Sequence, residues 1–265
     1  MDLATQSTVE LAKNYGMGFQ SQLNSQIAEV EGLANGTNIQ NLVLENYNGV
    51  TLGNDSPYYT NVTDLFATAS DYAGNNVNYY LYDVNGYYIT SSDNTNTDDW
   101  QEHMAIPVED ITETKILQCS PLDEIESIDV VSPIIIKSQI VGLIRANITS
   151  RYFGSFIPED GSAFIMTNDG GYLFTSTGLT GQRELETQAF NCLNGADNAK
   201  DYGHLKASSF KNIYGFCKLS DSNWLYLIKQ QGTQYQQILA TLPITMSITL
   251  IIILMIAIWV SRILS

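Results

Sequence analysis

The stretch VNYYLYDVNGYYITSS, residues 77–92, decides the fold because it encodes a β-hairpin. Its two halves are rich in tyrosine and β-branched residues, which favour strands, and residues 83–86 (DVNG) supply the reversal between them. Side chains alternate along a strand, so Tyr80 and Tyr82 are expected on one face and Tyr79 on the other. At most one of these faces can line a pocket.

The strand pattern continues and then returns in shorter form. The runs VVSPIIIK (130–137) and IVGLIRANIT (140–149) are expected to be strands joined at Ser138-Gln139. A second strand, turn and strand follows as SAFIMTNDGGYLFTST (162–177), and NIYGFCKL (212–219) and NWLYLIKQ (223–230) supply its closing strands. The sequence therefore predicts two hairpin-led modules. Internal duplication is one explanation, and two unrelated hairpins would give the same pattern.

A long amphipathic helix is predicted before the first module, from Thr8 to Leu33, and Asn35-Gly36 is a typical helix end. A shorter helix is predicted from Val62 to Tyr72. The apolar residues of the long helix recur at helical spacing and form one stripe: Val9, Ala12, Phe19, Leu23, Ile27 and Val30. The predicted fold class is α+β, with one long N-terminal helix followed by two antiparallel modules.

Residues 238–260, ILATLPITMSITLIIILMIAIWV, contain no charged side chain and predict a transmembrane helix. At about 1.5 Å per residue the run reaches roughly 35 Å, whereas a hydrocarbon core is about 30 Å thick. A buried core helix is the alternative. Arg262 favours a cytoplasmic C-terminus and hence an extracytoplasmic domain. Without a leading apolar segment, we expect a fragment of a longer two-span protein, with a tail-anchored cytoplasmic protein as the alternative.

Composition excludes several classes of function. The chain has 12 basic and 28 acidic residues and a formal charge of −16, which disfavours nucleic-acid partners. It has two histidines and none of the common catalytic or nucleotide-binding motifs, so we expect neither an enzyme nor a cofactor. Asp93, Asp98 and Asp99 lack the regular spacing of a calcium loop, and a solvated loop is the favoured interpretation.

The order of these segments resembles the double Cache sensor domain of bacterial transmembrane receptors. The resemblance rests on the first hairpin, on Ser-Pro-Ile at 132–134, on Ile-Val-Gly at 140–142, on Asn-Asp-Gly at 168–170 and on the strand that begins at Trp224. It implies two stacked PAS-like modules, a homodimer formed through the long helix, and a small ligand such as an amino acid, amine or organic acid in the membrane-distal module.

The resemblance also implies where the domains divide. We expect the long helix at 1–35, the membrane-distal module at 36–157, the membrane-proximal module at 158–234 and the span at 238–260.

The expected ligand pocket lies in the distal module. Amino-acid-binding members of the family carry an Arg-x-Trp-Tyr patch after the first hairpin and an Asp near the end of the last distal strand. Here Asp98-Asp99-Trp100 and Asn147 take these places, which favours an amine or other cation. The predicted binding residues are Tyr80, Tyr82, Asp98, Trp100 and Asn147. The alternatives are a sensor without a ligand and a membrane-anchored adhesion protein.

Overall fold

The computed structural model describes residues 3–47, 56–93, 99–100, 106–118, 127–158, 161–174, 179, 182–194, 201–206 and 212–231. Within these ranges, none of the helices has the length and apolar character needed to cross a membrane. The predicted span at 238–260 lies outside the described residues.

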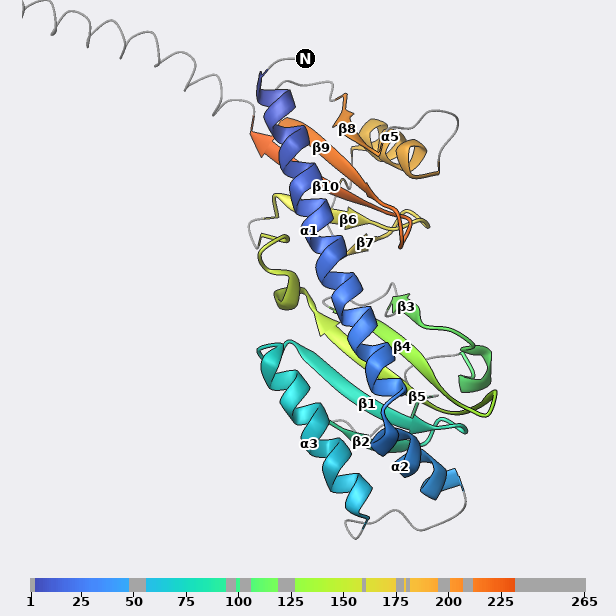
Figure 1. Ribbon diagram of the computed structural model, residues 1–265. Coiled ribbons are helices and arrows are strands. Elements are labelled where there is room, and N and C mark those ends of the chain that lie inside the picture. The colour runs from blue at the N-terminus through green and yellow to red at the C-terminus, as the bar shows by residue number, and fades with distance from the viewer. Residues whose placement is uncertain are drawn as a thin grey trace, which may run out of the picture.

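Helix α1 (Leu3–Ala34) is the longest element and runs beside both sheets (Figure 1). Its 32 residues extend about 48 Å at 1.5 Å per residue. The predicted helix is confirmed and begins five residues earlier than expected. It ends where the amide of Gly36 donates to the carbonyl of Leu33 at 2.8 Å.

The first module contains two helices and a five-stranded antiparallel sheet in the order β2-β1-β5-β4-β3. The helices are α2 (Thr37–Tyr47) and α3 (Pro57–Tyr72), with a short 3-10 helix, η1 (Val108–Asp110). The strands are β1 (Val77–Asp83), β2 (Tyr88–Ser91), β3 (Lys115–Gln118), β4 (Ser127–Ile136) and β5 (Gln139–Thr149).

The second module repeats this strand order as β7-β6-β10-β9-β8, again antiparallel throughout. Its strands are β6 (Ala163–Met166), β7 (Tyr172–Leu173), β8 (Tyr202–Leu205), β9 (Asn212–Leu219) and β10 (Trp224–Gln231). It also contains helix α5 (Arg183–Asn194), and the 3-10 helix η2 (Ser150–Phe153) leads into it. The predicted α+β class and both antiparallel modules are confirmed.

The first hairpin forms where the sequence places it. The carboxylate of Asp83 accepts hydrogen bonds from the amides of Asn85 (2.8 Å) and Tyr87 (2.9 Å), and Gly86 takes a φ of 84° that suits glycine. The β4–β5 hairpin turns one residue earlier than predicted, at Lys137 and Ser138, which both have positive φ.

The helices α2 and α5 and the strand β8 were not predicted. Helix α5 has the sequence RELETQAFNCLN, in which polar residues separate the few apolar ones. Strand β8 is only four residues long. Such short or polar segments carry little periodic signal and depend on packing against the rest of the fold.

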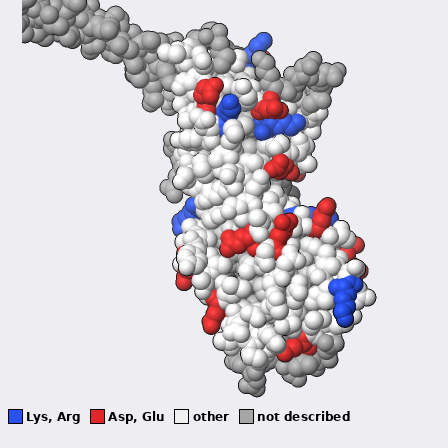
Figure 2. All heavy atoms as spheres, viewed as in Figure 1, with Lys and Arg blue, Asp and Glu red and all other residues white. Residues whose placement is uncertain are grey.

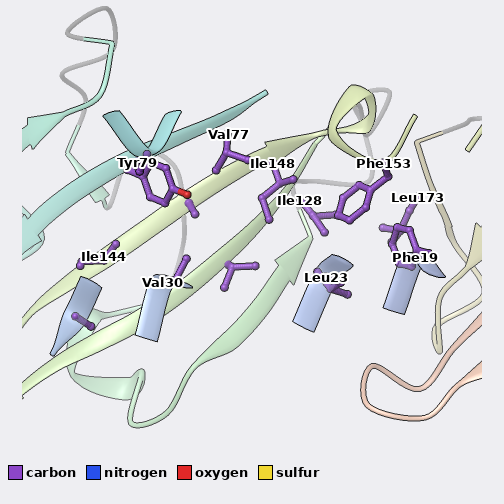
Figure 3. Packing of buried hydrophobic residues seen from close by; sticks show 14 of the residues in the cluster. Phe19, Leu23, Val30, Val77, Tyr79, Ile128, Ile144, Ile148, Phe153 and Leu173 are labelled. Atoms are coloured by element: carbon purple, nitrogen blue, oxygen red, sulfur yellow. The ribbon is translucent and has the colours of Figure 1, made fainter. Parts of the chain in front are cut away.

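One apolar core runs along α1 and takes in side chains from both modules. Figure 3 shows Leu23 and Val30 of α1 facing strand residues of the first module. At the junction of the modules, the ring of Phe153 lies 4.5 Å from that of Phe19 and 5.8 Å from that of Phe174, between centroids. The apolar stripe of α1 therefore packs against both modules.

In the second module α1 approaches β9 so closely that glycine is required. A methyl group on Gly215 would lie 2.5 Å from the carbonyl oxygen of Thr8. One on Gly16 would lie 2.9 Å from the Cβ of Cys217. Since backbone atoms cannot move aside as a flexible side chain does, any side chain at Gly215 pushes the helix off the sheet.

We expect Gly215→Ala to lower the free energy of unfolding by about 1–3 kcal/mol, the usual cost of overpacking a core. Urea denaturation measures the change. Gly32→Ala is the matched control, because a methyl group there has nothing within 4 Å and α1 should gain about 0.5–1 kcal/mol. Equal effects of the two substitutions would contradict the close approach of α1 and β9.

Candidate functional site

In the first module, the sheet face opposite α1 carries a small cluster of its own. Strand alternation separates the two faces: Tyr79 belongs to the α1 core, whereas Tyr80 and Tyr82 belong to this second cluster. The predicted division of the tyrosines is confirmed. The buried members of the cluster, here called the inner face, are Tyr80, Tyr82, Trp100, Val108, Ile111, Val131 and Leu143.

A buried ion pair lies on the inner face. In the sheet register Arg145 of β5 stands opposite Tyr80 of β1, and its Nε lies 3.0 Å from the carboxylate of Asp129 on β4. Asp129 is fully buried and Arg145 is 6% exposed. The same carboxylate accepts a hydrogen bond from the amide of Asn147 at 2.8 Å. Burial alone would lower the pKa of Arg145, but Asp129 outweighs it and the pKa is raised, so the guanidinium stays charged.

The tyrosines surround this guanidinium. The ring centroid of Tyr80 lies 5.0 Å from the guanidinium carbon, within range of a cation–π contact. Burial raises the pKa of Tyr82, and the nearby charge of Arg145 only partly offsets that rise. The pKa of Tyr80 is also raised, mainly by burial. Both phenols are therefore neutral hydrogen-bond donors over the physiological range.

Two donors on the inner face are left open. The buried Nη1 of Arg145 and the buried hydroxyl of Tyr82 have no hydrogen-bond partner other than each other among the described residues, and the contact between the two groups counters part of the rise in the Tyr82 pKa. A buried donor without an acceptor costs about 1–3 kcal/mol, and native proteins rarely leave one unfilled. With the carboxylate of Asp129, these two donors form the polar centre of the inner face.

The side chain of Trp100 packs against the inner face and does not point to solvent. Its side chain is fully buried, its ring meets that of Tyr82 edge to face at 5.7 Å, and its Nε1 donates to the carbonyl of Ile106 at 2.6 Å. Beside it, the carboxylate of Asp99 accepts from the amide of Tyr88 at 2.9 Å. Asp99 is thus engaged by the backbone of β2.

The structure brings four of the five predicted residues onto this side of the sheet. Tyr80 and Tyr82 line it from β1, Trp100 closes it, and the partly buried Asn147 bonds to Asp129 and to the Ser127 hydroxyl. Asp98 lies outside the described residues. Ligand contact by any of the five stays a prediction.

The sequence interpretation missed Arg145 and Asp129, the charged centre of the inner face. A signal for Arg145 exists: it is the only charged residue in the apolar run IVGLIRANIT. A charge inside a buried strand is costly unless it is paired. Because β4 and β5 form a hairpin, its partner is expected on β4, where Asp129 lies.

The corresponding face of the second module is covered by apolar side chains. Helix α5 covers it with Leu185, Ala189 and Leu193, and the sheet supplies apolar side chains from β6, β9 and β10. Lys218 of β9 lies on the same face as Tyr214 and Phe216, and its Nζ donates to the carbonyl of Leu193 in α5 at 3.1 Å. The two modules therefore share a strand order, but among the described residues only the first has a buried ion pair on this face.

Comparisons by sequence give no match to a family model or to a curated protein. Comparisons by structure do. The extracellular domain of the candidate histidine kinase vpHK1S-Z8 is 11% identical, with a TM-score of 0.60 over 88% of this chain and 97% of that one. The ligand-binding domain of the Pseudomonas aeruginosa chemoreceptor PctB, in complex with L-Arg, is 15% identical, with a TM-score of 0.58 over 92% and 94%.

A third similar structure is the ligand-binding domain of the P. aeruginosa chemoreceptor PctC in complex with GABA. It is 16% identical, with a TM-score of 0.56 over 86% of this chain and 99% of that one. Such low identities establish the fold alone. The fold expected from the resemblance to double Cache sensor domains is confirmed along nearly the whole described chain.

We expect Arg145→Met to cost about 3–5 kcal/mol of unfolding free energy, because it leaves the buried charge of Asp129 uncompensated. The double variant Arg145→Met with Asp129→Asn removes both charges and keeps an acceptor for Asn147, so it should recover most of the loss. Urea denaturation of the three proteins measures both values. A single variant within about 0.5 kcal/mol of the parent would show that the pair is not buried as described.

Proposed function

We propose that this chain is the extracytoplasmic sensing domain of a bacterial transmembrane receptor and that it binds a small ligand at the inner face of the first module. The observation that carries the proposal is the pair of buried, open donors, Arg145 Nη1 and Tyr82 hydroxyl. They lie in a fold similar to that of the ligand-binding domains of PctB, in complex with L-Arg, and of PctC, in complex with GABA.

The chemistry of the open donors favours a carboxylate-bearing ligand. Guanidinium and phenol groups both donate, and an ionised carboxylate accepts several hydrogen bonds at once. Asp129, the carboxylate at the centre of the inner face, is already paired with Arg145, so the groups left there for a ligand are donors. The aromatic wall of Tyr80, Tyr82 and Trp100 suits the carbon skeleton of such a ligand. We assign no catalytic step to these residues.

Coupling to the rest of the receptor would pass through β1. The inner face of this strand carries Tyr80 and Tyr82, and its other face carries Tyr79, whose hydroxyl accepts from the side-chain amide of Gln26 on α1 at 2.7 Å. A ligand that shifts β1 would therefore bias α1. Couplings of this kind are typically worth about 1–3 kcal/mol.

The membrane arrangement belongs to the proposal as well. Residues 238–260 would form the membrane helix, 36–157 the membrane-distal module and 158–234 the proximal one, with a homodimer through α1. The uncharged character of 238–260 supports the span, and the placement of similar structures as extracellular domains supports the location of the rest. The competing function, a membrane-anchored adhesion protein, predicts no small ligand.

A thermal-shift screen of the chain against amino acids, organic acids and amines tests the ligand class. Carboxylate-bearing compounds should raise the melting temperature, since a ligand at 100 times its dissociation constant adds about 2.7 kcal/mol. Responses confined to amines that lack a carboxylate would contradict the proposed chemistry. No change in melting temperature with any of the compounds would favour the adhesion protein or a sensor without a ligand.

Tyr82→Phe tests the proposed contact directly. Its hydroxyl has only Arg145 as a partner among the described residues, so its removal should cost at most about 1.5 kcal/mol of unfolding free energy. The affinity for the carboxylate found in the screen should fall about 10- to 150-fold, the value of one hydrogen bond to a charged group. Titration calorimetry measures the change. Tyr172→Phe is the matched control, because the Tyr172 hydroxyl is also buried without a hydrogen-bond acceptor among the described residues but lies in the second module. An equal loss of affinity in both variants would argue against the site.

A further inference from the structure

A second cavity, of about 560 Å³, opens between the two modules. Its lining comes from four separate segments: α1, the strand β3 with the residue before it, the β6–β7 turn and the β9–β10 turn. This volume is in the range of small-molecule pockets, about 300–1,000 Å³. It shares no lining residue with the inner face except Leu117 at its rim. The cavity is called the junction groove below.

Residues of opposite charge line the junction groove, one sign from each module. The first module contributes Lys115 on the edge strand β3, and the second contributes Asp169 and Asp221 from two turns. In the view of Figure 2, acidic and basic side chains gather where the molecule narrows between the modules. A ligand that carries both charges, separated along its length, is complementary to this arrangement.

Both carboxylates are held in place before any ligand arrives. Asp221 accepts from Asn24 of α1 at 2.8 Å and from the Ser220 hydroxyl at 3.0 Å. Asp169 accepts from the Thr167 hydroxyl and from the amide of Gly171 at 3.2 Å. These hydrogen bonds, from Thr167 foremost at Asp169 and from Asn24 at Asp221, lower the pKa of each carboxyl. Both are ionised at neutral pH, and little side-chain entropy remains to be lost on binding.

The groove also offers an apolar surface and an open polar atom. Trp224, which is 4% exposed, and the partly buried Ile27 line it. The hydroxyl oxygen of Ser222 lines it as well and is buried without a hydrogen-bond partner among the described residues. Apolar walls with a few fixed polar groups are the usual composition of a ligand site.

We propose that the junction groove is a second binding site, for a small zwitterion with well-separated charges. Its ammonium group would lie against Asp169 and Asp221, its anionic group against Lys115, and its methylene chain against Trp224. Such a ligand bridges the modules and adds contacts between them. The proposal does not depend on a ligand at the inner face.

Titration calorimetry of the full chain with ω-amino carboxylates, from glycine to 6-aminohexanoate, tests the proposal. We expect binding by the longer members, because the residues of opposite charge come from different modules, and weaker binding by hexylamine and hexanoate, which carry one charge each. Lys115→Gln and Asp221→Asn should each weaken binding about 10- to 150-fold, since a hydrogen bond to a charged group contributes about 1.5–3 kcal/mol.

Two controls separate this site from others. Lys229→Gln removes a lysine outside the groove lining and should leave the affinity unchanged. Tyr82→Phe separates the two sites, because it weakens binding at the inner face only and leaves the binding that depends on Lys115 unchanged. Lys115→Gln keeps the test decisive if Asp221→Asn, which replaces the charged acceptor of the bond from Asn24 by a neutral one, unfolds. The proposal is overturned by an absence of binding at millimolar concentrations, by equal binding of the singly charged compounds, or by a loss in Tyr82→Phe without one in Lys115→Gln.

Discussion

The packing of one apolar helix stripe against two sheets is the interaction on which the rest of the structure depends. Helix α1 buries Val9 and Ala12 against the second sheet and Val30 against the first, and Phe19 lies between them beside Phe153. Gly215 lets β9 come within contact of the helix backbone. Because the interior of a protein is close-packed, neither sheet can shift along α1 without disturbing the same core. The shared helix thus makes a mechanical link between the modules.

Because α1 packs against only one face of each sheet, the side chains on the other face can differ between the two modules. In the second module α5 fills that face with leucines, and the result is an ordinary apolar core. In the first module the same strand positions hold Tyr80, Tyr82 and the Arg145–Asp129 pair. A buried ion pair is weak evidence for stability, since an apolar pair often serves as well. Among the described residues, this pair and the tyrosines around it distinguish the first module from the second.

Much of the fold could be predicted from sequence because it depends on simple periodicities. The stripe of α1 and the alternation of Tyr79 against Tyr80 and Tyr82 follow directly from helix and strand geometry. The site could be predicted only in part. The alternation of side chains along a strand predicts which residues share a face of the sheet, but not which residues of other strands they contact. Arg145 and Asp129 become neighbours only through the register of β4 and β5. Helix α5 was missed because its sequence is mostly polar, and the helix is stabilised by packing a few apolar residues on the sheet that it covers.

Hydrogen-exchange mass spectrometry with and without the tightest-binding carboxylate tests the central claim, that the inner face binds a ligand and that α1 senses it. The account predicts slower exchange in β1 and β5, which carry the binding side chains, and a change along α1 that reaches the part packed on β9. Protection confined to α5 and the second sheet would contradict the assigned site. Protection of β1 and β5 with no change anywhere in α1 would contradict the role of the shared helix.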